Sequence, residues 1–339
     1  MHMSDALLSV AVGATMTAVS TGIIGTSIKK INKIELEDKK IPMMGVMGAF
    51  VFAAQMINFT IPGTGSSGHI GGGILLAALL GPYPSLITMA SILLIQCLFF
   101  ADGGLLALGS NIFNMGVITC LVAYPLIYKP IVKREMTPKR ITIASILAVT
   151  IGLQLGSFAV VLETIASGVT ELSFLTFLSF MQPIHLVIGL IEGAITAAVL
   201  NFIYQMRREI LDSALLKAPM KPVSLKRVLF IMVFATLITG GLLSAYASSS
   251  PDGLEWSIAN VMGITELENN TSVHNTLFNL QEKTAILPDY SIVNEAGDPS
   301  PASTGIAGVL GGLFTLLMAV IAGVVLMYFK KRNAGRPVN

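Results

Sequence analysis

Charged and aromatic residues are scarce in this chain. Of its 339 residues only 12% are charged and 7% are aromatic, whereas 53% are hydrophobic and the mean hydropathy is +0.77. So little charge does not cover the surface of a soluble globule of this size, which excludes the water-soluble classes and indicates a lipid bilayer as the solvent. Polar and apolar residues also do not alternate over stretches of about ten residues, which argues against a membrane barrel. The sequence therefore predicts an all-α polytopic membrane protein.

Cysteine and the common catalytic motifs are nearly absent too. The two cysteines, Cys97 and Cys120, fall inside apolar runs, where we expect them to pack as small hydrophobic side chains rather than to pair. The chain has no GxxxxGK[ST] phosphate loop, so we expect no ATP hydrolysis from it. It also lacks HExxH and paired intramembrane carboxylates, which argues against a membrane-embedded metallohydrolase. An enzyme is therefore not predicted.

Basic residues gather in four clusters that separate the apolar runs. All of them except Lys283 lie within residues 29–40, 129–140, 207–227 and 330–336. The positive-inside rule predicts that these clusters face the cytoplasm, the C-terminal one included. The first apolar run precedes the first cluster and has no basic segment before it, so it is expected to be a retained span rather than a signal peptide. The N-terminus is then expected outside the cell membrane.

The number of spans follows if each basic cluster must return to the cytoplasm. Seven spans are expected at residues 6–28, 41–60, 70–81, 84–101, 104–128, 140–163 and 174–206, and two more at 226–248 and 305–329. The third run is short, so a tilted or partly re-entrant helix is the alternative there. The predicted organisation is a seven-helix bundle (1–206), a cytoplasmic linker (207–225) and a two-helix unit (226–339) that encloses an outer segment (249–304).

The outer segment 249–304 is strongly acidic. It holds eight aspartates and glutamates against the single basic residue Lys283. Such a bias attracts cations at long range, although a solvated acidic loop explains it equally well. His274 within this segment is expected to be solvated.

The first two residues place three nitrogen atoms next to one another. Removal of an initiator methionine favours a small second residue, so the bulky His2 is expected to leave Met1 and its free α-amine in place. An amine with an ordinary pKa of about 7.7–8 and an imidazole with one of about 6.5 both lose a proton readily to a metal near neutral pH. With the Met1–His2 peptide nitrogen they form two fused chelate rings in one plane. One position of a square stays open.

His69 can supply a fourth nitrogen. It is the other histidine expected in a loop on the outer face close to the membrane, within the stretch GTGSSGHIGGG. Glycine allows the backbone to pass very close to another segment. Four nitrogens in a plane suit Ni²⁺ or Cu²⁺, and Co²⁺ is accommodated. On these residues alone two simpler explanations stay open, a chance histidine at position 2 and a flexible connecting loop.

Several ordered motifs resemble one known family. The start MH before an apolar helix, then GSSGHIGGG, GPYPSLI and FADGGLLALGSNIFNMG, are similar to the nickel/cobalt-binding S components of energy-coupling factor transporters, the CbiM/NikM family. This resemblance covers residues 1–206. The later motif PDGLEW at 251–256, between two expected spans, looks like the small accessory CbiN/NikN or PDGLE component fused to the same chain.

The resemblance implies a function and a set of partners. It implies that the amine of Met1, the amide nitrogen and ring of His2, and the ring of His69 hold Ni²⁺ or Co²⁺ as transported substrate, with no cofactor. It also implies import into a prokaryotic cell driven by separate cytoplasmic ATPases through a transmembrane T component, with lipid around the bundle and no nucleic-acid partner. The alternative is a stand-alone secondary transporter, which would need repeats that residues 1–100 and 101–206 do not show.

Polar residues near the expected outer face are candidates for supporting the metal ligands. Asp102, Asn111 and Asn114 would support His69 by hydrogen bonding its unmetallated nitrogen, or would join helices to one another. Ser66 and Ser67 would bond the N-terminal loop, or would only form a turn.

Two further groups lie on the expected helices. His185 and Glu192 are seven residues apart on one helix face and are expected to form a polar network inside the bundle, with a part in metal release as the alternative. Ala14, Ala18 and Gly22 form a stripe of small residues on the first span. Such a stripe suits docking on the T component or close packing against a neighbouring span of the same chain.

Overall fold

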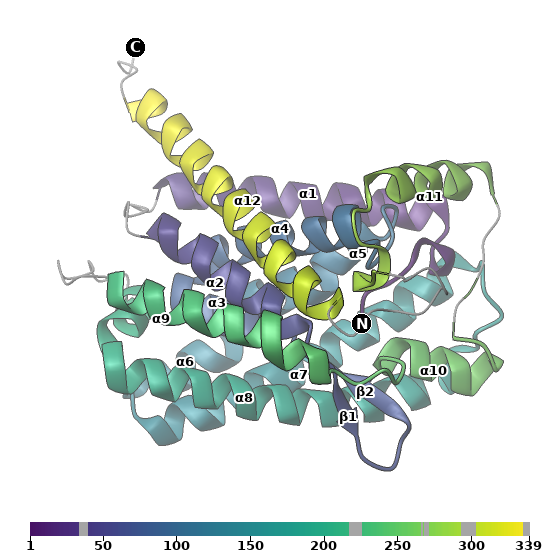
Figure 1. Ribbon diagram of the computed structural model, residues 1–339, viewed down its shortest axis with the longest axis horizontal. Helices are drawn as coiled ribbons and strands as arrows, with labels where there is room; N and C mark the ends of the chain where they lie inside the picture. Colours follow the sequence, from purple (N-terminus) through teal and green to yellow (C-terminus); the bar gives the residue numbers. More distant parts are fainter. Residues whose placement is uncertain (34–39, 217–225, 266, 268–270, 293–302, 335–339) are drawn as a thin grey trace.

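This computed structural model describes residues 1–33, 40–216, 226–265, 267, 271–292 and 303–334 of the chain. In chain order the elements are η1 (Asp5–Leu7), α1 (Val10–Lys33), α2 (Lys40–Gln55), β1 (Phe59–Ile61), β2 (Ser66–Gly68), α3 (Gly73–Leu80), α4 (Pro82–Phe100), α5 (Leu108–Asn111), η2 (Ile112–Tyr128), α6 (Lys129–Arg134), α7 (Pro138–Ser167), α8 (Phe174–Leu216), α9 (Lys226–Leu237), η3 (Ile238–Leu242), η4 (Leu243–Tyr246), α10 (Gly253–Met262), α11 (Ser272–Thr284), η5 (Pro288–Tyr290) and α12 (Ser303–Ala334). Long helices dominate the molecule (Figure 1).

Six helical stretches in the described part of the chain are long and apolar enough to cross a membrane. They are Val10–Ile31, Pro82–Phe100, Leu108–Arg134, Pro138–Ser167, Phe174–Leu216 and Ser303–Val325. Each overlaps one predicted span, and the chain is the helical membrane protein that its composition indicates. The other three predicted spans are shorter: α2 has 16 residues, α3 has 8, and the third lies within Phe230–Tyr246. The count of seven plus two spans therefore stays a prediction.

The short helix α3 agrees with the partly re-entrant alternative. At 1.5 Å per residue, its 8 residues rise about 12 Å, against roughly 30 Å of hydrocarbon. Every residue of α3 is buried, because α4, η2 and α8 pack around it. It therefore lies inside the bundle and starts directly after the His69 loop.

A small antiparallel sheet interrupts the helices before α3. The helix α2 ends at Gln55 rather than near residue 60, and β1 then pairs with β2 in the register Phe59↔Gly68 and Ile61↔Ser66. The turn between the strands passes through Gly63 and Gly65, whose φ angles of 79° and 74° suit glycine. The glycine and serine stretch is thus an ordered hairpin, and the all-α expectation is wrong at this point.

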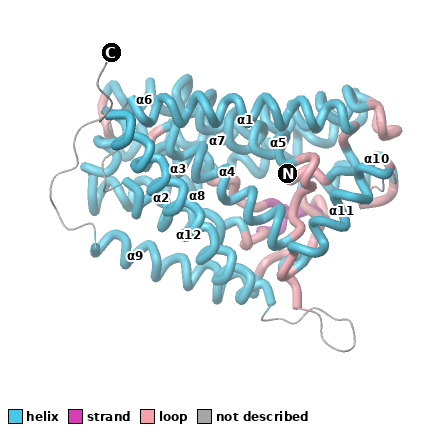
Figure 2. The backbone as a smooth tube through the Cα atoms, turned by 90° about the horizontal axis from the view of Figure 1, so that it is seen from above, coloured by secondary structure: helices cyan, strands magenta, loops and turns pink. Residues whose placement is uncertain are grey.

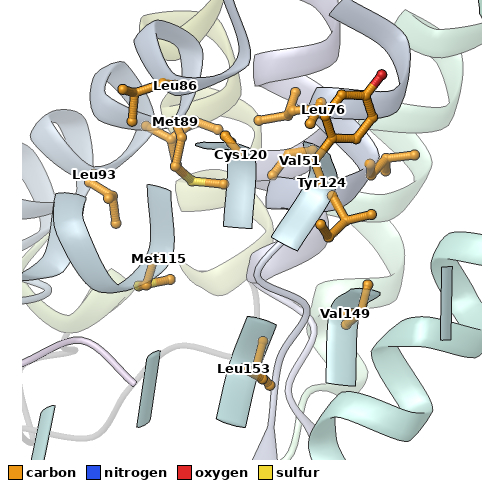
Figure 3. Close-up of a cluster of buried hydrophobic side chains, with 14 of the residues drawn as sticks. Val51, Leu76, Leu86, Met89, Leu93, Met115, Cys120, Tyr124, Val149 and Leu153 are labelled. Carbon is orange, nitrogen blue, oxygen red and sulfur yellow. The ribbon is translucent and has the colours of Figure 1, made fainter. Parts of the chain in front are cut away.

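The core consists of apolar side chains from α4, η2, α7 and their neighbours (Figure 3). Cys120 lies among them in van der Waals surroundings, near Leu86, Met89 and Met115. Both cysteines are free and buried, which confirms that they pack as small hydrophobic side chains. In a bilayer such contacts stabilise the fold by close packing rather than by removal from water.

The C-terminal unit packs directly on the N-terminal helices and the hairpin. The helices α9 and α12 both lie against α2, α10 lies against α8 and β2, and α11 lies against α4 (Figures 1 and 2). Residues 249–304 are therefore not a simple solvated loop, since they contain α10 and α11. In the residues expected as linker, α8 kinks at Arg207 (φ −154°, ψ 63°) and continues to Leu216, and residues 217–225 lie outside the described residues.

The elements that carry basic clusters share one end of the bundle. In Figure 1 the C-terminal ends of α1 and α12, the helix α6 and the start of α9 lie toward the left, whereas the hairpin, α10 and α11 lie at the right. This segregation is what the positive-inside rule requires of a protein with these clusters.

Candidate metal site at the N-terminus

The first residues of the chain are folded into the bundle rather than projecting from it (N in Figures 1 and 2). The side chains of Met1 and His2 are only 9% and 8% exposed. Two hydrogen bonds fix the backbone just beyond them, because Met3 N donates to Asn111 Oδ1 (2.8 Å) and Asn111 Nδ2 donates to Met3 O (3.1 Å). The N-terminus is thus held in place by the side chain that ends α5.

The structure brings the two predicted imidazole ligands together. The rings of His2 and His69 stack with their centroids 5.4 Å apart and their planes 15° from parallel. His69 follows β2 directly, and the backbone then turns at Gly72 (φ 77°), whose N–H donates to Glu192 Oε1 (2.9 Å). The hairpin and the start of α3 therefore hold the His69 ring against the N-terminus.

The α-amine of Met1 binds a carboxylate from the C-terminal unit. Its partner is Asp252 Oδ2, 251 positions away in the sequence. The other oxygen of Asp252 caps α10 by accepting the N–H groups of Leu254 (2.7 Å) and Glu255 (2.9 Å). Burial raises the pKa of Asp252, but the adjacent α-ammonium more than offsets burial, so the pKa lies well below its ordinary value. Asp252, the N-cap residue of α10, therefore also holds the first residue of the chain.

Both imidazoles are in an environment that favours their neutral form. Burial, followed by the Met1 ammonium and the charge of His2, lowers the pKa of His69 to about 4. Burial also lowers the pKa of His2, against the opposing effect of Asp102. Since a metal binds only the unprotonated nitrogen, two neutral imidazoles near neutral pH are poised for metal binding.

The predicted supporting residues contact the N-terminal segment, not His69. Asp102 Oδ1 lies 3.3 Å from His2 Nδ1, and Asn111 binds the backbone of Met3. Asn114 donates to Glu163 Oε2 (3.0 Å). None of the three bonds the His69 ring here, and the bond of Asn114 to Glu163 joins η2 to α7, which is the helix-joining alternative. Asp102 lies in the turn after α4, Asn111 ends α5 and Asn114 lies in η2.

Ser66 and Ser67 also have other partners than the expected N-terminal loop. Ser67 Oγ donates to Ser250 O (2.7 Å) and Ser67 N to Pro251 O (2.8 Å), while Ser66 Oγ lies 3.4 Å from Pro251 O. Trp256 of the PDGLEW motif donates its indole N–H to Thr64 O (2.8 Å). The hairpin therefore holds the segment that delivers Asp252.

His185 and Glu192 line a cavity of about 30 Å³ together with Met1, His69 and Asp252. They do not bond each other, but each bonds a backbone group inside the bundle. His185 Nδ1 donates to Met181 O (2.8 Å), and Glu192 binds the backbone at Gly72. A space of this size admits about one water-sized sphere, so the cavity beside His69 has no room for a larger ligand.

His274 is buried, contrary to the expectation that it is solvated. The residue is only 5% exposed, and its Nε2 donates to the carbonyl oxygens of Asp5 (3.1 Å) and Leu8 (3.0 Å). Thr271 Oγ1 lies 2.6 Å from its Nδ1. This histidine therefore fixes the start of the N-terminal segment from α11. Nothing local in the sequence indicates that pairing.

The available donors are unusual for a metal site because half of them belong to the main chain. Among the described residues, no three side chains of histidine, cysteine, aspartate or glutamate converge as a metal cluster. The amine of Met1, the amide nitrogen of His2 and two imidazoles are nitrogen donors that suit Ni²⁺, Cu²⁺ or Co²⁺. Sequence reasoning missed the buried Gln55 and Gln96 near His2; their only signal is an amide in an apolar run.

The small-residue stripe of α1 faces outward. Ala14, Ala18 and Gly22 are exposed in this chain, and a side chain at Gly22 would meet nothing within 4 Å. The internal contact of α1 lies on another face, where Ser20 Oγ donates to Gly109 O (2.6 Å). Packing of this stripe against a neighbouring span of the same chain is therefore not observed.

Comparisons with known proteins agree with the fold. A family model described as the cobalt uptake substrate-specific transmembrane region (CbiM) matches residues 2–210, and a PDGLE domain matches residues 226–328. A putative fused nickel transport protein NikMN of Archaeoglobus fulgidus is 32% identical over 318 residues, which cover 94% of this chain and 96% of that protein. The cobalt transport protein CbiM of Geobacter sulfurreducens is 29% identical over 220 residues, 62% of this chain and 61% of that protein.

A solved structure is similar as well. The crystal structure of a truncated transition metal transporter matches with a TM-score of 0.54 and 30% identity over 61% of this chain and 99% of that one. With this helical fold, the family match and the full-length relative define a polytopic membrane protein of metal transport rather than an enzyme. The chain belongs to the CbiM family and carries a PDGLE domain behind the family region.

Proposed function

We propose that this chain is the substrate-binding membrane subunit of an ATP-driven energy-coupling factor importer for a divalent transition metal, Ni²⁺ or Co²⁺. The observation that carries the proposal is the stacked pair of His2 and His69 beside the buried α-amine. The ligands are the amine of Met1, the amide nitrogen and ring of His2, and the ring of His69. Relatives named as nickel and as cobalt transport proteins support both substrates.

Capture of the metal exchanges one partner of the amine for another. The amine binds the carboxylate of Asp252 in this structure, so the incoming cation must displace that carboxylate from the amine. The amine and the His2 amide each release a proton on binding, while the neutral His69 ring binds without releasing one. The negative charge of Asp252 remains next to the bound cation and compensates part of its charge.

The remaining parts of the importer are separate proteins. We place the N-terminus outside and the C-terminus in the cytoplasm of a prokaryotic cell membrane, which the segregation of basic ends in Figure 1 supports. The outward stripe of Ala14, Ala18 and Gly22 is the proposed contact with the transmembrane T component, which couples the chain to cytoplasmic ATPase subunits. The chain itself supplies the substrate site.

The amine ligand can be tested by extending the chain by three residues. Untagged protein should bind about one Ni²⁺ per chain, and three extra glycines before Met1 should lower the affinity at least about tenfold, because the amine is displaced from the chelate. The matched control carries the same three glycines after Asn339 and should bind as the untagged protein does. Equal binding by both extended proteins would falsify the amine ligand. His69→Ala should also weaken binding, because only three of the four proposed nitrogen ligands would remain.

The energy source is tested by uptake into cells or vesicles. Uptake of Ni²⁺ or Co²⁺ should require co-expressed T component and ATPase subunits and should stop when the ATPase subunits lack their phosphate-loop lysine. Accumulation against a gradient by this chain alone would instead favour the stand-alone secondary transporter.

A further inference from the structure

A cavity of about 220 Å³ lies where α6 ends and α7 begins. It is lined by Pro130, Ile131 and Arg134 of α6 and by Arg140 from the first turn of α7. The cavity is at the end of the bundle that carries the basic clusters, opposite the hairpin (Figure 1). Pockets for drug-sized ligands hold roughly 300–1,000 Å³, so this smaller cavity suits a headgroup-sized anion rather than a nucleotide.

The charge around the cavity is strongly positive. Residues 129–140 hold five basic residues against the single acidic residue Glu135. Glu135 compensates little of this charge, because its Oε2 lies 3.8 Å from Arg140 Nη2, beyond hydrogen-bond distance, and its side chain is 67% exposed. Arg134 has no ion pair among the described residues. Two guanidinium groups therefore line one cavity with almost no counter-charge from the chain itself.

The guanidinium group of Arg140 also lacks a hydrogen-bond acceptor. Its Nη1 is closed off from solvent and bonds no acceptor in the described part of the chain. A buried charged donor without a partner is costly, whereas an oxyanion can accept from one guanidinium through two oxygens at once. Arg140 lies in the first turn of the 30-residue helix α7, whose N-terminal end favours an anion. These features select a phosphate group as the ligand.

Exposed apolar side chains continue from the cavity along the spans. Leu126 is 71% exposed about one turn before Pro130, and Ile143 and Leu147 are 42% and 44% exposed. Ile143 and Leu147 are three and seven residues after Arg140, so they lie on the same face of α7 as this arginine. A free phosphate ion would use only the arginines. A phospholipid would use the arginines with its headgroup and the apolar side chains with its acyl chains.

We propose that this cavity binds the phosphate headgroup of an anionic phospholipid, with Arg134 and Arg140 on the phosphate and the acyl chains along Leu126, Ile143 and Leu147. Basic pockets between transmembrane helices on the cytoplasmic side hold such headgroups. Arginine suits the contact because its planar donors match two phosphate oxygens. The bound lipid joins the end of α6 to the start of α7. The inference rests on the proposed orientation only for the leaflet, which is the cytoplasmic one.

The lipid preference of the full-length chain can be measured by native mass spectrometry. Protein released from mixed micelles with equal amounts of phosphatidylglycerol and phosphatidylcholine should retain phosphatidylglycerol at least about tenfold over phosphatidylcholine, whose headgroup has no net charge. Inorganic phosphate added to the same micelles should not replace the lipid. Phosphate adducts in place of phosphatidylglycerol would assign the cavity to a free anion and overturn the proposal, as would equal retention of the two lipids.

Two double variants separate the cavity from the basic surface around it. Arg134→Gln together with Arg140→Gln should lower the retention of phosphatidylglycerol at least about tenfold, because two charge-assisted phosphate contacts are lost. Lys133→Gln together with Lys139→Gln removes the same charge from exposed neighbours that do not line the cavity, and should lower it less than about threefold. Equal losses would show only a general attraction to a basic surface and would refute the site.

Thermal unfolding gives a second measurement that also checks folding. Compared with phosphatidylcholine, phosphatidylglycerol should raise the unfolding midpoint of the wild-type chain and of the lysine double variant but not of the arginine double variant, because a ligand of the folded state stabilises it. The same rise in all three proteins would overturn the proposal. Ni²⁺ titration of the wild-type chain decides the proposed function separately, since the metal site lies at the other end of the bundle.

Discussion

At the scale of single residues, Asp252 has two tasks that substitution can separate. Asparagine caps a helix about as well as aspartate, so Asp252→Asn keeps α10 but removes the charge that holds the Met1 amine. We expect an amine-reactive reagent to label the α-amine several-fold faster in this variant than in the wild-type chain.

Glu255→Gln is the matched control for that experiment. Glu255 belongs to the same capping box, since its Oε2 accepts Asp252 N (2.9 Å), but the contact of the Met1 amine is with Asp252. Labelling should therefore stay at the wild-type rate. Equal rates in the wild-type chain and in Asp252→Asn would show that the carboxylate does not hold the amine.

His69 should make the metal-free protein sensitive to acid. Its pKa is about 4 in the folded chain against 6.5 as the ordinary value, so the folded state binds fewer protons between these pH values. Its contribution is fully present above pH 6.5 and is lost as the pH falls toward 4. The Met1 ammonium and His2 act in the same direction as burial, and Asp252 opposes them.

The measurement compares the wild-type chain with His69→Gln in the presence of a chelator. The difference in free energy of unfolding should shrink by up to about 3 kcal/mol between pH 6.5 and 4, because the variant has no proton to gain at this position. Parallel pH profiles of the two proteins would contradict the buried neutral histidine.

At the scale of elements, the hairpin and α3 position His69 through Gly72. A Cβ at Gly72, with φ at 77°, would lie 2.5 Å from Val51 Cγ1 on α2. Gly72→Ala should therefore cost more than the roughly 1–2 kcal/mol of left-handed strain, and it should weaken Ni²⁺ binding by moving the loop. Gly63→Ala is the control, since its φ is 79° but a Cβ there meets nothing within 4 Å. Thermal unfolding and Ni²⁺ titration of both variants should separate the effect of backbone strain from the effect of moving the loop that carries His69.

At the scale of the whole molecule, the outward face of α1 should bind another membrane protein. Small residues let helices approach closely, so Gly22→Leu should reduce the amount of this chain that co-purifies with a tagged T component. Ni²⁺ binding by the isolated chain should not change. Ala198→Leu places the same side chain at an exposed alanine of α8 and should leave co-purification intact. Equal loss in both variants would argue against α1 as the contact.

The orientation in the membrane can be read from introduced cysteines. The native cysteines are 1% and 0% exposed, so they give little background. A membrane-impermeant maleimide should label Asn275→Cys on α11 in intact cells and Glu135→Cys only after the cells are opened. The reverse pattern would invert the proposed topology.

Much of the site was predictable because its chemistry is local. The chelate of the Met1 amine with His2 needs only two adjacent residues, and the glycines around His69 indicated a close approach. The partners of Asp102 and Ser67 were not predicted, although both residues are near the site. Their distance along the chain from His2 and Pro251 leaves no periodic signal, so their partners depend on helix rotation and on the path of the hairpin.

The sequence by itself determined the membrane class and the approximate helix positions and pointed to the proposed nitrogen donors, because long apolar runs and an N-terminal chelate are properties of neighbouring residues. Only the tertiary structure decided that Asp252 holds the amine, that His274 fixes the N-terminal segment and that Gln96 bonds His2. These contacts join segments up to 269 positions apart, and close packing of whole helices sets them rather than any local preference.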